Sequence, residues 1–120
     1  MIKVNDILEQ ALLYDFYGEL LNDHQKEVYE QFVLEDLSLS EIAADQGISR
    51  QGVHDLVKRC QKALEGYEEK LHLVEKFLVI KKNVQEINTV LDSYEKCGQQ
   101  SPEEMATRIR KISNLIIDEL

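Results

Sequence analysis

Apolar residues recur with the period of an α-helix along nearly the whole chain, and no other feature of the sequence restricts the fold as much. One broad apolar face extends from Ile7 to Leu21, and similar faces follow at residues 28–33, 53–78, 77–94 and 105–120. No segment alternates in the manner of a half-buried strand, and no internal repeat is present. With 120 residues, of which 43% are hydrophobic, the chain suits one domain with a helical appendage. The predicted fold class is all-α.

Local start and stop signals divide this pattern into separate helices. The expected signals are N-caps at Asn5, Asn22, Ser49 and Ser101, the last followed by Pro102, a capping box at Ser38 and Glu41, and a stop at Gly47. From Cys60 to Leu78 the apolar spacing settles into an a/d-like seam. The register of this seam slips around residues 77–82, which predicts a bend or a second helix there, and residues 97–100 are expected to form a loop.

Several functional classes are disfavoured by what the sequence lacks. It has no run of 18 apolar residues and no hydrophobic leader, so neither a transmembrane helix nor a signal peptide is predicted. Cys60 and Cys97 lie far apart, and the three histidines have no metal-site spacing. Cys60 falls on the apolar seam and is expected to be a small core residue. A cytoplasmic, non-enzymatic protein with reduced thiols and no metal or cofactor is the simplest interpretation.

Residues 39–56 have the spacing of a helix-turn-helix motif. Ala43 is the small residue where two helices would cross, and Gly47 follows four residues later as a turn residue able to adopt a positive φ. The expected apolar positions are occupied by Ile42, Ile48, Val53 and Leu56. Gln46 departs from the pattern, because an apolar residue is common at its position. The alternative is an ordinary pair of packed helices joined by a glycine. The spacing and the two caps favour the motif, at about residues 38–64.

Charge is distributed unevenly around this motif. The chain carries a net charge of −9, which argues against a simple binder of polyanions, and residues 1–37 alone carry −7. Residues 49–64 carry +3, however, and they coincide with the second helix of the motif.

The geometry of the motif names candidate nucleic-acid contacts. The N-terminal residues of the second helix reach base edges in the major groove, where Arg reads guanine and Gln reads adenine. The predicted contacts are Arg50, Gln51 and His54 to base edges, Ser49 with the free N–H groups of the first turn to a phosphate, and Lys58, Arg59 and Lys62 to phosphates. The alternative is a solvated helix face. Asp55 supports the alternative, because an acid repels DNA unless it accepts from a cytosine amino group.

The apolar surface beyond the motif indicates a partner. We predict a helix-turn-helix domain at residues 1–66 and a helical C-terminal extension at residues 67–120 that mediates dimerisation. The seam and the aliphatic last helix exceed what one small motif must bury. They could fold back within the chain or pair with a second chain. A homodimer is favoured, because two-fold dimers suit major-groove reading by two second helices about 34 Å apart.

Residues 21–64 resemble region 4 of sigma-70-type factors. The resemblance is carried by Gln25-Lys26-Glu27-Val28, the run from Leu37 to Ala43, the run from Ile48 to Val53, Lys58-Arg59 and Leu64. Gly52 stands where the resemblance leads us to expect alanine. In those factors this region reads the −35 promoter element through its second helix, which implies DNA binding here.

Residues 7–80 are similar to one smaller family. Tyr14-Asp15-Phe16-Tyr17, the helix start Ser49-Arg50-Gln51, the run from Tyr67 to Leu71 and the length resemble the YlxM family of small bacterial helix-turn-helix proteins. Genes of that family commonly neighbour those of the signal recognition particle GTPase and its receptor. The resemblance therefore implies a regulatory role in the signal recognition particle pathway.

Two functions remain open from the sequence. The first is a DNA-binding regulator that uses the basic helix. The second is a protein-interaction or RNA-binding regulator of the targeting machinery, in which the motif is only a scaffold and acidic residues 1–37 contact a basic partner.

Overall fold

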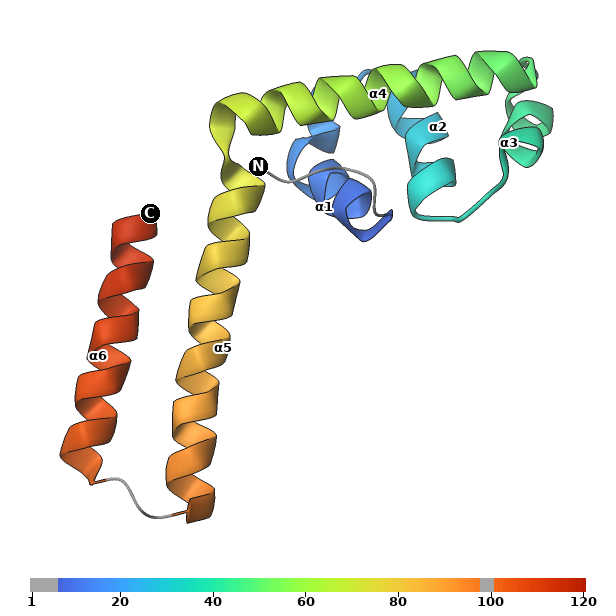
Figure 1. Cartoon of the computed structure of the whole chain (residues 1–120). Helices are drawn as coiled ribbons and strands as arrows, with labels where there is room; N and C mark the ends of the chain where they lie inside the picture. Colours follow the sequence, from blue (N-terminus) through green and yellow to red (C-terminus); the bar gives the residue numbers. More distant parts are fainter. Residues whose placement is uncertain (1–6, 98–100) are drawn as a thin grey trace. The chain divides into compact units, whose positions relative to one another are not determined.

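The computed structural model describes residues 7–97 and 101–120, which are helical apart from short connections (Figure 1). The elements are α1 (Ile7–Tyr17), the 3₁₀ turn η1 (Gly18–Leu20), α2 (Asp23–Val33), α3 (Leu39–Gln46), α4 (Arg50–Leu71), α5 (Leu73–Cys97) and α6 (Pro102–Glu119). No strand occurs within these ranges, which confirms the all-α prediction. The predicted cap at Asn5 lies outside the described residues. So does the predicted loop over residues 97–100, apart from Cys97, which is the last residue of α5.

None of the described helices combines the length and the apolarity needed to cross a membrane.

The predicted helix starts are confirmed where the structure describes them. The Asn22 side chain accepts from the backbone N–H of Gln25, and the Ser38 and Glu41 side chains form a reciprocal capping box. Ser101 caps α6, whose first residue is a proline. These side chains satisfy backbone donors that a helix leaves free at its N-terminus.

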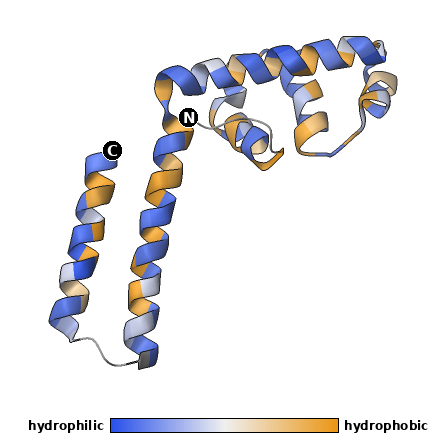
Figure 2. Cartoon of the chain, viewed as in Figure 1, coloured by the Kyte–Doolittle hydropathy of each residue, from blue (hydrophilic) through white to orange (hydrophobic). Residues whose placement is uncertain are grey.

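The chain divides into two compact units, Met1–Val74 and Glu75–Leu120. In the first unit, α1, α2 and α3 each pack against α4. Its core combines apolar and aromatic side chains from all four helices, with Leu13, Val28, Tyr29, Ile42, Val53, Cys60 and Leu64 wholly inaccessible to solvent. Hydrophobic and hydrophilic residues alternate along α4 as the amphipathic pattern requires (Figure 2).

Cys60 is the buried core residue that the sequence predicts. Burial raises the pKa of its thiol to about 11, because a thiolate would lose its hydration there. The side chain is therefore a neutral thiol at physiological pH, inert as a nucleophile.

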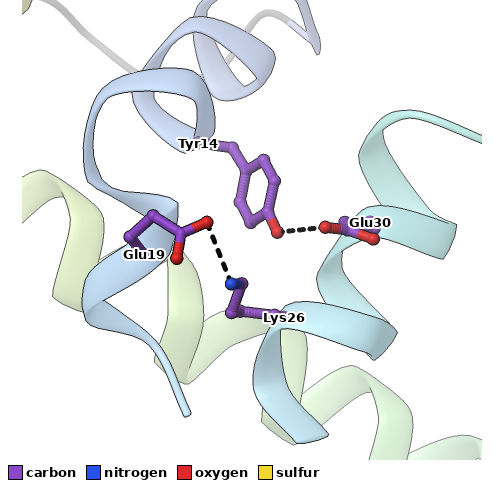
Figure 3. Close-up of polar contacts among 4 residues, drawn as sticks. All are labelled: Tyr14, Glu19, Lys26 and Glu30. Atoms are coloured by element: carbon purple, nitrogen blue, oxygen red, sulfur yellow. Dashed lines mark hydrogen bonds and ion pairs between the residues drawn. The ribbon is translucent and has the colours of Figure 1, made fainter. Parts of the chain in front are cut away.

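Two polar contacts join the α1–η1 segment to α2 (Figure 3). The Tyr14 hydroxyl donates to Glu30 Oε1 at 2.5 Å, and Lys26 Nζ lies 3.0 Å from Glu19 Oε1. Burial of Tyr14, and after it the bond to the Glu30 carboxylate, raises the pKa of the phenol. The hydroxyl therefore stays protonated and holds its donor role across the physiological pH range.

The end of α4 differs from the sequence prediction. The seam from Cys60 to Leu78 does not lie on one helix, because α4 ends at Leu71 and His72 adopts a left-handed conformation with φ 56°. The sequence predicted a bend or a second helix around residues 77–82. A second helix, α5, does follow, but it begins earlier, at Leu73, and runs through these residues. At the break, the Leu73 N–H donates to the Tyr17 hydroxyl and the Val74 N–H donates to Glu68 Oε1. These side chains provide the freed backbone donors with partners, which makes the break possible.

The second unit contains most of α5 and all of α6, which runs back alongside it (Figure 1). Val90 on α5 and Ile112 on α6 are its buried apolar residues among those that the structure describes. Val84 and Leu91, one heptad apart on α5, remain 43% and 37% exposed. A two-helix unit with so small a core has little hydrophobic stabilisation of its own.

Candidate nucleic-acid interface

The helix-turn-helix is built by α3, Gly47 and α4. Gly47 has φ 68° and ψ 30°, the left-handed conformation that favours glycine, and its N–H donates to the carbonyl of Ala43. The next residue, Ile48, also donates to the Ala43 carbonyl. Ile42 on α3 and Val53 on α4 are fully buried. The spacing predicted from sequence therefore corresponds to two helices held by a tight turn and a shared core.

The departure at Gln46 has a structural explanation. Its side-chain amide donates to Gln31 Oε1 on α2 at 3.3 Å and to Asp45 Oδ2 at 3.2 Å. Gln31 Nε2 in turn donates to Asp45 Oδ2 at 2.6 Å. A polar network thus joins α2 to α3 where other motifs use an apolar contact.

The structure places all seven predicted contact residues on the accessible surface at the start and along the outer side of α4. Ser49 precedes the helix, and Arg50, Gln51, His54, Lys58, Arg59 and Lys62 are exposed along it. The opposite side of α4 carries the buried residues Val53, Val57, Cys60 and Leu64. The +3 segment is therefore a basic surface that solvent can reach, extending along the first half of α4.

Ser49 has a structural role at the start of this surface. Its hydroxyl oxygen accepts from the backbone N–H of Gly52 at 2.9 Å. A Cβ at Gly52 would lie 3.1 Å from this oxygen, so the alanine expected there would crowd the cap slightly. The Ser49 hydroxyl can still donate its own proton to a phosphate.

Asp55 also belongs to this surface, and its contacts were not predicted from the sequence. Gln51 Nε2 donates to Asp55 Oδ1 at 3.0 Å, and His54 Nδ1 lies 3.6 Å from the same oxygen. The carboxylate therefore adjoins two of the side chains predicted to reach base edges. The signal was present in the sequence, because residues four apart on a helix face each other and Gln–Asp is a pair that forms such bonds.

Comparison with known proteins agrees with this geometry. Residues 4–105 match the family described as "Putative helix-turn-helix protein, YlxM / p13 like", UPF0122. A UPF0122 protein of Caldanaerobacter subterraneus subsp. tengcongensis is 51% identical over 83 residues, which are 69% of this chain and 71% of that protein. A UPF0122 protein of Thermoanaerobacter sp. (strain X514) is 49% identical over 92 residues, 77% of this chain and 73% of that protein. The chain therefore belongs to the UPF0122 family of YlxM / p13-like helix-turn-helix proteins.

Proposed function

We propose that this chain is a DNA-binding regulatory protein, without enzymatic activity, that reads duplex DNA through α4 in the manner of sigma region 4. The observation that carries the proposal is the exposed basic surface at the start of α4, directly after the tight turn of the motif. A helix in this position fits the major groove, where its first residues face base edges and its later cations face phosphates. A cytoplasmic location is part of the proposal.

The test is fluorescence anisotropy of the full chain with a random duplex and with a hairpin RNA. A pair of copies offers six cations to phosphates, namely Lys58, Arg59 and Lys62 from each α4. About six phosphate contacts should weaken binding by about 10³-fold between 50 and 200 mM salt. Duplex binding with that salt dependence is the expected result. Absence of duplex binding at 50 mM salt would overturn the proposal, and tighter binding of the hairpin would favour RNA.

We further propose that the protein acts as a homodimer through its second unit. Val84 and Leu91 form an exposed apolar row on α5, and α6 leaves Leu115 and Ile117 exposed at 49% and 65%. Two such hairpins can bury the Val84–Leu91 row and one side of each α6 in a four-helix bundle. On α5, residues 75–85 carry +2 and residues 86–97 carry −2, so an antiparallel pair of α5 helices would place opposite charges together.

Sedimentation equilibrium of the full chain tests the dimer. Val84→Asp should convert a dimer into a monomer at micromolar concentrations, because it would place a charge without a partner inside the bundle. Thr89→Asp adds the same charge to α5 away from this row and should leave the dimer intact. Equal dissociation constants for the two variants would contradict the proposed interface.

One observation favours a second candidate function. The exposed side chains of α1, η1 and α2 include many carboxylates, among them Asp15, Glu19, Asp23 and Glu27. Such a surface would attract a basic protein. It would also attract an RNA-bearing particle, by contact with the basic proteins of that particle. In this candidate the chain regulates the signal recognition particle pathway by direct contact, and the helix-turn-helix serves as a scaffold.

A further inference from the structure

Asp55 occupies the middle of the surface that would face DNA. It is the only acid among residues 49–64. Its side chain is 54% exposed, on the side of α4 opposite the buried Val53 and Val57. A carboxylate here weakens attraction to every phosphate backbone. A protein that needed only non-specific affinity would gain from its removal.

The contacts of Asp55 leave part of its hydrogen-bonding capacity unused. Gln51 Nε2 donates to Oδ1 of Asp55, and His54 Nδ1 lies near the same oxygen. An ionised carboxylate has further lone pairs on both oxygens and can accept additional hydrogen bonds. Gln51 keeps a second amide proton and its carbonyl oxygen for a base. Asp55 and Gln51 therefore present acceptors and one donor side by side, with the Gln51 amide oriented by Asp55.

The bases differ sharply in what they offer such a group. In the major groove cytosine presents its N4 amino donor, whereas guanine and thymine present acceptors that repel a carboxylate. Adenine combines an amino donor with the N7 acceptor, which suits an amide better than a carboxylate. A cytosine opposite Asp55 thus forms a charge-assisted bond, and a guanine or thymine there leaves the charge desolvated and unpaired.

We propose that Asp55 is a specificity-determining residue, which accepts from the N4 amino group of one cytosine and disfavours duplexes that lack it. The inference rests on the proposed function, because it deepens how α4 reads DNA. Affinity for duplex DNA and selectivity among duplexes then depend on different residues of α4. Lys58, Arg59 and Lys62 supply attraction to any duplex, and Asp55 reduces that attraction except where it accepts a hydrogen bond from a cytosine.

The test begins with duplexes selected by the full chain from a random pool. Affinities are then measured by anisotropy for the selected duplex and for duplexes that replace each cytosine in turn. The proteins are the unsubstituted chain, Asp55→Asn and the control Glu69→Gln. Glu69 is an exposed acid about 21 Å further along α4, so its substitution makes the same charge change outside the first turns.

Asp55→Asn is expected to bind random duplex several-fold more tightly and to lose about tenfold discrimination at one cytosine position, while Glu69→Gln keeps that discrimination. Unchanged discrimination at every position in Asp55→Asn, or an equal loss in Glu69→Gln, would overturn the inference and leave DNA binding standing. Failure of the unsubstituted chain to bind any duplex would overturn the proposed function and the inference together. Circular dichroism of each variant checks that the helices are retained.

Discussion

Reversing two charges on α4, Arg50→Glu with Arg59→Glu, is expected to lower affinity for duplex DNA by about 100-fold or more. Arg50 lies in the first turn, where a base contact is worth about 1–3 kcal/mol, and Arg59 lies further along, where it would meet a phosphate. Both side chains are exposed, so the substitutions remove no core contact. The measurement is anisotropy with the same duplex at 50 mM salt.

The matched control for this prediction is Lys70→Glu with Lys96→Glu. These lysines are exposed in the last turns of α4 and α5, outside the motif, and their reversal changes the net charge by the same amount without removing a cation from residues 75–85. The control should lose far less affinity. If both double variants bind DNA as the unsubstituted chain does, the basic surface of α4 is not the interface.

The same variants separate the two candidate functions. A complex with targeting-pathway components that forms through the acidic α1–α2 surface should survive reversal of Arg50 and Arg59. It should weaken instead when acids such as Asp15 and Glu19 are neutralised, and it should weaken further as salt rises. Retention of DNA affinity in the acid-neutralised variant would locate the two interactions on different surfaces.

Tyr17→Phe is expected to lower the free energy of unfolding by about 1–3 kcal/mol, although it removes a single oxygen atom. The Tyr17 hydroxyl is buried, donates to Glu68 Oε1 at 2.5 Å and accepts from the Leu73 N–H at 3.1 Å. Its loss leaves a carboxylate that is only 7% exposed without one of its donors. Urea unfolding followed by circular dichroism measures the effect.

Tyr29→Phe is the matched control for Tyr17→Phe. Tyr29 is equally inaccessible, but its hydroxyl lies near Gln61 without a well-formed hydrogen bond to a described residue. Removing it should leave stability unchanged or raise it, because an unsatisfied buried polar group costs free energy. Equal destabilisation by both substitutions would show that the Tyr17–Glu68 bond contributes little beyond packing.

Alkaline pH provides a second measurement on Tyr17. Burial, followed by the bond to Glu68, raises the pKa of Tyr17 to about 12 from its ordinary 10. The folded state therefore retains a proton that the unfolded chain releases, so this stabilisation is complete below pH 10 and disappears as the pH rises to 12. The unsubstituted chain should lose more stability over this range than Tyr17→Phe does.

Much of the fold could be predicted from the sequence because its signals are local. Ser38, Glu41, Ser49 and Ser101 cap helices through bonds to backbone groups three residues away. Gly47 adopts the left-handed conformation that its position in the motif requires. Such interactions depend on sequence spacing alone, so one chain is enough to infer them.

The exposure of the candidate contacts is local in the same sense. Arg50, His54 and Lys58 are spaced four residues apart, which places them on one side of a helix, and all three are exposed. The bond between Gln51 and Asp55 was missed, although it is also local, because Asp55 was considered only in relation to DNA and not in relation to its neighbours on the helix. A side chain's hydrogen-bonding capacity and its net charge are separate properties, and both determine what a base encounters.

The position at which α4 ends was decided by tertiary structure. In the sequence, the apolar seam continues through His72 with unbroken heptad spacing, and nothing local stops the helix there. In the fold, Tyr17 from α1 reaches Glu68, and together they take up the backbone donors of Leu73 and Val74. The partner of the Leu73 N–H lies 56 residues away in the sequence, and that of the Val74 N–H lies 6 residues away. These two hydrogen bonds help to offset the strain of the positive φ at His72.

The sequence by itself determined which segments are helical, where most of them begin, and that a tight turn precedes a basic helix. These properties follow from periodicity, capping and glycine, each of which acts within a few residues. Only the tertiary structure decided where the long apolar seam is interrupted and which buried polar groups find partners. Those outcomes depend on side chains brought together from distant parts of the chain. In the protein interior the low dielectric strengthens each hydrogen bond and raises the free-energy cost of each polar group without a partner.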